Sequence, residues 1–338
     1  MEIQTALESL GHAQETQRIS EAAVENITRW LTQPEYAAYQ PELLTRIEAS
    51  AWDELDELFW TELPFGTAGR RGRMAPVGTN AINTRTIGET IQALAQYVLA
   101  QEDASPATCA IAYDTRHRSR EFAELSAGIM VAAGFHVYFF AGVRATPQLS
   151  TTIRHLDCDC GVMISASHNP PTDNAVKVFW RGGAQLRPPH DAAILERMRS
   201  IQAIEQVEFD QAVANGQVEY CHEAMDAYYQ EQVLRSGATS RDPRAIRIVY
   251  SPLHGVGRTS IEPILRAAGF DVTVYGPHAA PDPDFSEVPQ HVANPENPAV
   301  FDRIVTGCGD EADLILASDP DADRIGCAAP LSEVEKKW

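Results

Sequence analysis

Positive charge is scarce in this sequence. Its 338 residues include 27 lysines and arginines against 47 aspartates and glutamates, so the formal net charge is −20 at pH 7. Nucleic acid and anionic membranes are themselves negative, so neither is expected as a partner of so acidic a chain. An anionic small substrate is not excluded, because local arginines and a metal ion can reverse the field at one site.

Long apolar runs are also missing. Nothing in the sequence approaches the roughly 18 consecutive apolar residues that a membrane-spanning helix needs. No early segment combines a basic start with a long apolar run, as a signal peptide would. We therefore expect a cytoplasmic location, and the sequence carries no signal for an oligomeric state.

Cysteines are few and scattered. Of the six, only Cys158 and Cys160 are close together, and a single intervening residue is not the usual spacing of zinc ligands. Reduced, structural thiols are expected.

Helical and strand patterns alternate along the chain. Residues 1–60 carry apolar residues at three- and four-residue spacing, which is typical of helices. Later, short apolar runs alternate with amphipathic segments, which predicts an α/β fold with mixed, mostly parallel sheets sandwiched by helices. The length suits two domains, and a weaker stretch at 185–240 separates them. We predict a helical extension over 1–60, a first domain over 61–210 and a second over 211–338.

Individual elements can be placed within this plan. Helices are expected over residues 22–31, 41–59, 86–101, 121–133, 191–204, 225–234, 259–268 and 299–305. Strands are expected over residues 109–113, 136–140, 175–180, 245–250, 271–275 and 314–317, with residues 154–159 leading into a further strand before Ser167. Residues 276–298 hold six prolines and should be largely loop.

The first candidate site lies within residues 161–177. An apolar, strand-like start gives way to small polar residues, and Pro170 and Pro171 prevent the strand from continuing. Ser167, beside His168, would then lie at the carboxyl end of a strand, where open α/β sheets bind ligands. A nucleophilic serine fits this position, but a simple polar turn accounts for the same residues.

A second candidate is the glycine- and arginine-rich stretch at residues 63–74. Its glycines would let the backbone approach a ligand, and its arginines could bind phosphate oxygens. A flexible basic surface loop is the alternative. The residues concerned are Gly66, Thr67, Gly69, Arg70, Arg71, Gly72 and Arg73.

A third candidate is acidic. Asp319, Asp321 and Asp323 alternate at the end of a predicted strand, and carboxylates this close repel one another unless a cation lies between them. Oxygen ligands suit magnesium or calcium, but a calcium-binding EF-hand loop is excluded, because Gly326 lies too far along and no glutamate follows at its twelfth position. An exposed acidic turn is the alternative.

Together these stretches resemble the α-D-phosphohexomutase family, the phosphoglucomutases and phosphomannomutases. Residues 65–72 are similar to the family's amino-terminal loop, 113–116 to its next motif, 165–170 to its phosphoserine loop and 319–324 to its metal loop. The helical amino terminus, with residues 251–257 and 294–298, is closest to the longer phosphoglucomutase/phosphopentomutase branch. The resemblance covers nearly the whole chain.

The resemblance implies a magnesium-dependent phosphosugar mutase, which interconverts a hexose 1-phosphate and 6-phosphate through a phosphoserine and a hexose 1,6-bisphosphate. Ser167 would carry the phosphoryl group, and Asp319, Asp321 and Asp323 would hold Mg²⁺ together with it. Lys177 would move the proton of the sugar hydroxyl, with a pKa lowered by nearby cations.

Further residues take roles by the same resemblance. Arg71 and Arg324 would lie near the transferred phosphate, and His168 would orient the phosphoserine loop. Substrate or phosphate contacts are implied for Thr67, Arg70, Arg71, Arg116 and Asn169. Four positions depart from the family pattern: Arg70 stands where an apolar residue is usual, Arg118 replaces a common asparagine, Pro171 replaces a small residue, and Ala175 replaces a glycine.

The family fold has four domains, and the motifs of the third and fourth are not found in these 338 residues. From this we expect a carboxy-terminally truncated chain that is inactive as a mutase. The alternatives are a non-catalytic remnant that binds magnesium, a phosphopentomutase, or a phosphatase that uses Ser167 and water. The sequence does not distinguish glucose, mannose and pentose phosphates.

Overall fold

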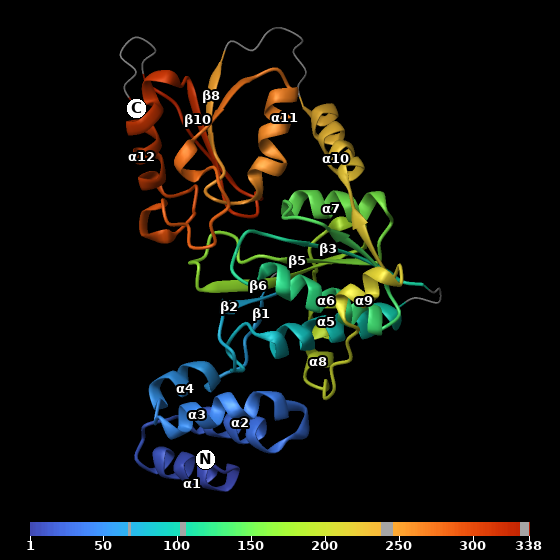
Figure 1. The fold of residues 1–338 in the computed structure, drawn as a ribbon, viewed down its shortest axis with the longest axis vertical. Coiled ribbons are helices and arrows are strands. Elements are labelled where there is room, and N and C mark those ends of the chain that lie inside the picture. The colour runs from blue at the N-terminus through green and yellow to red at the C-terminus, as the bar shows by residue number, and fades with distance from the viewer. Residues whose placement is uncertain (67–68, 102–105, 238–245, 332–337) are drawn as a thin grey trace.

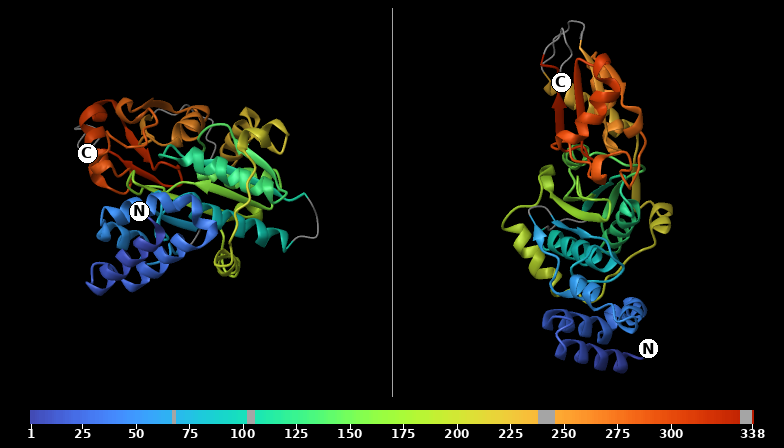
Figure 2. Two further views of the ribbon diagram at one scale, coloured as in Figure 1. Left: turned by 60° about the horizontal axis from the view of Figure 1, so that its bottom comes forward. Right: turned by 90° about the vertical axis from the view of Figure 1, so that its left-hand side faces the viewer.

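The computed structural model describes residues 1–66, 69–101, 106–237, 246–331 and 338. They form three bodies stacked along the long axis of the molecule: the N-terminal helices, a first α/β domain and a second α/β domain (Figure 1). The right-hand view of Figure 2 shows the same order from the side, with the first domain between the N-terminal helices and the second domain. The expected α/β class with mixed sheets is confirmed. Among the described residues, no helix combines the length and the apolar character that crossing a membrane requires.

The N-terminal helices enclose a core of their own around Trp30. The ring of Trp30 stacks on Tyr36 at 4.8 Å and meets the edge of Phe59 at 5.3 Å. Val77 and Ala81, from the loop before the next helix, join this core, so the extension packs on the first domain. The helices are α1 (Ile3–Glu15), α2 (Glu21–Thr32), α3 (Gln40–Glu48) and α4 (Trp52–Phe59).

The first sheet has the order β1-β2-β6-β5-β3-β4-β7. Its strands are β1 (Phe65–Gly66), β2 (Gly69–Arg73), β3 (Thr108–Tyr113), β4 (His136–Phe140), β5 (Cys160–Ile164), β6 (Asp173–Trp180) and β7 (Val218–Cys221). The pairs β5–β3, β3–β4 and β4–β7 are parallel, whereas β6, β2 and β1 add on as antiparallel strands. Because β5 and β6 form an antiparallel pair, the loop between them lies at the carboxyl end of β5.

Helices cover both faces of this sheet (Figure 1). On β3, Ile111 faces the core of α5 (Thr84–Leu99) and α6 (Ser119–Ala132), and Ala112 faces that of α7 (Thr146–His155) and α10 (Glu223–Ser236). This is the two-residue alternation of a strand buried on both sides. Two further helices, α8 (His190–Met198) and α9 (Phe209–Ala214), pack on α5 and α6 respectively.

The second sheet has the order β11-β10-β8-β9. Its strands are β8 (Arg247–Ser251), β9 (Asp271–Val274), β10 (Leu314–Ser318) and β11 (Ile325–Ala328). β8 pairs in parallel with β9 and β10, and β11 is antiparallel to β10. The helices α11 (Ile261–Ala267) and α12 (Pro298–Cys308) contribute to separate cores on its two faces.

Several elements of the first domain differ from the sequence-based expectation: the strands β1 and β2 lie where a loop was expected, and α7, α9 and β7 were not expected. The helix α7 was not expected, because Thr146, Gln148 and Thr152 are polar yet buried and obscure its apolar period. The short strand β7 pairs with β4, so the first sheet continues to Cys221, beyond the boundary expected at residue 210. A four-residue edge strand with mixed burial has too little pattern to be recognised in sequence.

Candidate active site

Ser167 lies on the loop that follows β5. Its backbone has φ of +57°, a left-handed conformation that is uncommon outside glycine and is concentrated at functional sites. The Oγ of Ser165 accepts the N–H of Ser167 at 2.9 Å. The residue is 1% exposed, so the loop conformation holds this hydroxyl inside the molecule.

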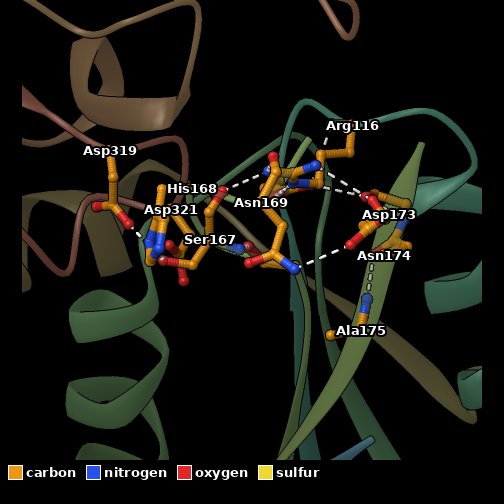
Figure 3. A network of polar contacts seen from close by, with 12 residues as sticks. Arg116, Ser167, His168, Asn169, Asp173, Asn174, Ala175, Asp319 and Asp321 are labelled. Carbon is orange, nitrogen blue, oxygen red and sulfur yellow. Dashed lines mark hydrogen bonds and ion pairs between the residues drawn. The ribbon is translucent and has the colours of Figure 1, made fainter. Parts of the chain in front are cut away.

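The guanidinium of Arg116 holds the same loop from within (Figure 3). It donates to the carbonyl oxygens of Ser167 and Asn169, each at 2.5 Å, and to those of Pro170 at 2.8 Å and Asp173 at 3.1 Å. A planar fork of donors is suited to binding several carbonyls at once. In this structure Arg116 therefore braces the serine loop, whereas the sequence had placed it on the substrate phosphate.

The acidic loop follows β10 in the second domain and meets the serine loop across the domain boundary. Donor oxygens of Asp319, Asp321 and Asp323 lie within 4.8 Å of one another. The Oδ1 of Asp319 accepts the backbone N–H groups of Asp323 and Arg324, at 3.1 and 3.0 Å. The hydroxyl of Ser167 donates to Oδ2 of Asp319 at 2.6 Å.

Asp321 is held from the first domain by two further groups. The Nζ of Lys177, on β6, lies 2.5 Å from its Oδ2 and 3.4 Å from Oδ2 of Asp323. The hydroxyl of Thr146, at the start of α7, donates to the same Oδ2 at 2.5 Å, and the Thr146 N–H donates to the Asp321 carbonyl at 3.0 Å. The sequence analysis missed Thr146, which a threonine and proline at the first two positions of a helix could have signalled.

Burial and mutual repulsion set the charges of this cluster. Burial, followed by the charges of Asp321 and Asp323, raises the pKa of Asp319 to about 8. Burial also opposes ionisation of Asp321, but the charge and hydrogen bond of Lys177, together with further hydrogen bonds such as that from Thr146, hold the pKa of Asp321 below its ordinary value. Burial would lower the pKa of Lys177, yet Asp321 and Asp323 raise it overall. The lowered pKa expected for Lys177 is therefore wrong here, because its nearest charges are anions.

The three aspartates fit a hard divalent cation. They offer only oxygen donors, which magnesium and calcium prefer. The Oδ1 of Asp321 is buried and has no hydrogen-bond partner among the described residues. Burying an anionic oxygen without a partner costs free energy, and a bound cation would remove that cost.

A cleft of about 460 Å³ opens beside Ser167, and we call it the serine cleft. Its lining residues are Gly66, Gly69, Arg70, Arg71, Ser167, Ala175, Val176, Lys177, Gln185, Asp323 and Arg324. It thus brings together the serine, the lysine and both arginines that the sequence had assigned to the transferred phosphate. Gln185 was not among the expected residues.

The remaining expected residues surround this cleft. Arg71 donates to Oδ1 of Asn169 at 3.2 Å, which orients the guanidinium. The side chain of Arg324 is 40% exposed and lies 3.3 Å from Glu296. The Nδ1 of His168 lies 3.3 Å from the Ser167 hydroxyl, and burial together with the charges of Arg324 and Arg71 lowers the pKa of the ring.

Two expected residues are placed differently. The guanidinium of Arg70 donates to the carbonyls of Leu63 and Thr86, each at 3.1 Å, and pairs with Glu89 at 3.2 Å. Successive side chains of a strand point to opposite faces, so the guanidinium of Arg70 lies behind the strand that carries Arg71. Thr67 lies outside the described residues.

Two protein-family models together match most of the chain. The family model for phosphoglucomutase/phosphomannomutase alpha/beta/alpha domain I matches residues 62–205. The model for domain II of the same family matches residues 226–331.

Two curated relatives align with most of this chain. A phosphoglucomutase from Staphylococcus haemolyticus is 34% identical over 273 residues, which are 79% of this chain and 48% of that protein. A phosphoribomutase from Saccharomyces cerevisiae is 31% identical over 324 residues, 89% of this chain and 51% of that protein. The chain spans about half the length of these curated relatives.

A solved structure shares the fold. The phosphoglucomutase/phosphomannomutase family protein from Burkholderia thailandensis has a TM-score of 0.63 at 20% identity, and the match covers 78% of this chain and 54% of that one.

Proposed function

Because the chain belongs to the phosphoglucomutase/phosphomannomutase family, we propose that it carries the phosphoryl-transfer site of a magnesium-dependent phosphosugar mutase. Ser167 alternates between a hydroxyl and a phosphoserine, and a hexose 1-phosphate is converted to the 6-phosphate through a hexose 1,6-bisphosphate. One observation carries the proposal: the Ser167 hydroxyl lies 2.6 Å from Asp319, in a cleft that Lys177, Arg71 and Arg324 also line.

Each transfer exchanges one phosphorus–oxygen bond for another. A sugar hydroxyl attacks the phosphorus of the phosphorylated Ser167, and the bond between phosphorus and Oγ breaks. Oγ leaves as an anion and accepts the next phosphoryl group from the sugar bisphosphate. Such transfers depend on positioning and on neutralising charge more than on covalent catalysis. Arg71, oriented by Asn169, and Arg324 supply positive charge at the mouth of the serine cleft.

Lys177 is the proposed acceptor for the proton of the attacking sugar hydroxyl. Its ammonium is now bonded to Asp321 and its pKa is raised, so it holds its proton while these carboxylates are unneutralised. It can accept the proton of an attacking sugar hydroxyl only when the charges of Asp321 and Asp323 are offset. This role is supported by the position of Lys177 in the lining of the serine cleft.

The metal site consists of Asp319, Asp321 and Asp323, together with the phosphate of Ser167. When bound there, Mg²⁺ offsets the negative charge that develops on the transferring phosphoryl group. The Oδ1 of Asp321, which has no hydrogen-bond partner among the described residues, and the raised pKa of Asp319 both support a cation at this position.

A pentose phosphate is the second candidate substrate. It is supported by the yeast relative named phosphoribomutase, which aligns with 89% of this chain. The chemistry at Ser167 would be the same, since both reactions pass through a sugar bisphosphate.

Phosphopeptide mapping tests the proposal on the 338-residue chain. Incubation with glucose 1,6-bisphosphate and MgCl₂ should place phosphate on Ser167, and chelation of the metal should prevent it. Ser167→Ala should abolish the label. Thr172→Val, which removes an exposed hydroxyl from the same loop, should retain it.

The outcomes separate the alternatives. Phosphate on Ser165 with Ser167 bare would refute the assignment. Release of inorganic phosphate without any sugar phosphate isomer would favour the phosphatase. Faster labelling from ribose 1,5-bisphosphate than from glucose 1,6-bisphosphate would favour the pentose substrate.

A further inference from the structure

A second cleft, of about 490 Å³, lies between the N-terminal helices and the first domain. Its lining residues come in part from α2, α5 and α8. Figure 1 shows these helices on the side of the molecule away from the second domain. We call it the Arg70 cleft. Its lining residues are Arg29, Trp30, Tyr36, Thr61, Glu62, Leu63, Pro64, Phe65, Arg70, Thr79, Thr86, Glu89, Leu195, Met198, Arg199 and Ile201.

Positive charge is buried at this cleft: Arg70 and Glu89 line it, and Arg85, which is not a lining residue, pairs with Glu89 behind them. The side chains of Arg70 and Arg85 are 5% and 2% exposed, and both pair with the single carboxylate of Glu89, at 3.2 and 2.8 Å. Arg85 is further fixed by the carbonyls of Ile201 and Gln202, each at 2.9 Å. Two guanidinium groups against one carboxylate leave a net positive charge in a sheltered place, which is costly unless an anion compensates it.

Hydrogen-bond donors without a protein acceptor lie at the cleft. The indole N–H of Trp30 and the Nε of Arg29 are buried and lack hydrogen-bond partners within the described part of the chain. Buried donors are nearly always satisfied in folded proteins, so these two donors favour an acceptor from outside the chain. The Nε and Nη1 atoms of Arg70 bond to the protein, whereas no bond to a described residue is made by its Nη2, which is therefore available to a ligand.

The rest of the lining is apolar. Leu63, Phe65, Leu195, Met198 and Ile201 face the cleft together with the aromatic residues of the N-terminal core. A volume of this size, with apolar walls and a few converging polar groups, is typical of small-molecule sites.

We propose that the Arg70 cleft binds a small organic anion, a carboxylate or phosphate ester of an apolar or aromatic group. The anionic oxygens accept from Nη2 of Arg70, and the apolar part lies against Leu195 and Met198. Arg70 lines both clefts, but its guanidinium bonds to Leu63, Thr86 and Glu89, which line the Arg70 cleft and not the serine cleft. Occupation of the Arg70 cleft does not depend on the proposed reaction.

The position of the cleft gives its ligand a route to the serine cleft. Arg70 and Arg71 are neighbours on β2, and β2 pairs with β6, which carries Lys177. A ligand bound to Arg70 therefore contacts a side chain of β2. The other face of β2 carries Arg71, which donates a hydrogen bond to Asn169. The site is placed to act as an effector site, with β2 as the element that both clefts share.

Isothermal titration calorimetry on the 338-residue chain tests the site with three probes. These are 2-naphthoate, 2-naphthyl phosphate and the neutral 2-naphthalenemethanol. At least one anion should bind tenfold or more tightly than the neutral probe, and the tighter of the two anions identifies the headgroup. Arg70→Met should abolish this preference.

Two further variants keep the test decisive. Arg71→Met, on the opposite face of the same strand, should retain anion binding in the Arg70 cleft. Leu195→Trp, which adds bulk to the apolar wall of the cleft and leaves every arginine in the sequence, should weaken all three probes, and circular dichroism should confirm that each variant is folded.

The proposal is overturned if the neutral probe binds as tightly as the anions, or if no probe binds at millimolar concentration. It is also overturned if folded Arg70→Met binds as the parent chain does. Loss of 2-naphthyl phosphate binding in Arg71→Met alone would assign that probe to the serine cleft.

Discussion

Replacing Thr146 by valine tests the contact that fastens the acidic loop of the second domain to the first domain. The Thr146 hydroxyl donates to Oδ2 of Asp321 at 2.5 Å, and both residues are buried. Valine has nearly the same shape but no donor, and its methyl group cannot approach a carboxylate oxygen that closely. The substitution therefore removes a charge-assisted hydrogen bond and pushes Asp321 out of position.

The loss of stability in Thr146→Val depends on the contacts that Asp321 keeps. A hydrogen bond to a charged group contributes about 1.5–3 kcal/mol, and Lys177 still neutralises the same oxygen at 2.5 Å. The backbone bond from Thr146 to Asp321 also persists, since it does not involve the side chain. We expect a loss of about 2 kcal/mol in the free energy of unfolding. With a urea slope of about 3 kcal/mol/M, the midpoint should fall by roughly 0.7 M.

Urea unfolding followed by tryptophan fluorescence measures this change, and Thr146→Ser is the matched control because it keeps the hydroxyl. The Mg²⁺ affinity of Thr146→Val should fall several-fold in calorimetry, since Asp321 loses one of the groups that orient it. A midpoint within 0.2 M of the parent value, with unchanged Mg²⁺ affinity, would show that Thr146 has no positioning role.

Two other changes probe the second domain. Asp321→Asn should weaken Mg²⁺ binding at least tenfold in calorimetry, because it removes one charge with little change in shape; equal affinity would count against the metal site. His278 lies buried between Ser251 and the Glu287 carbonyl, and burial lowers its pKa from 6.5 to about 4. The unfolded chain therefore binds this proton more readily, so the stability contribution is full above about pH 6.5 and is lost towards pH 4, about 3 kcal/mol in all. His278→Gln should flatten that part of the pH–stability curve, and an unchanged curve would contradict this assignment.

The sequence by itself determined the α/β class and the stretches that meet at the candidate site. An apolar run followed by small polar residues and prolines predicts a strand and a loop, as β5 and the serine loop show. The alternating aspartates after β10 likewise predicted a cluster of carboxylates. These features are local, because each depends on the order of neighbouring residues and on the geometry of one strand end.

Only the tertiary structure decided which groups face one another. Arg70 and Arg71 are adjacent in sequence, yet the pleat of β2 sends one guanidinium to Glu89 and the other to Asn169. Arg116 proved to brace the serine loop, because the four carbonyls of that loop converge on its guanidinium.

Long-range contacts explain the remaining differences. Thr146 and Asp321 are 175 positions apart, and no local pattern connects them. The direction of the Lys177 pKa shift depends on which charges lie nearest, and in the folded chain these are Asp321 and Asp323 rather than the arginines. Electrostatic effects fall off with distance, so their sign is determined when the two domains are assembled and not by the order of residues along the chain.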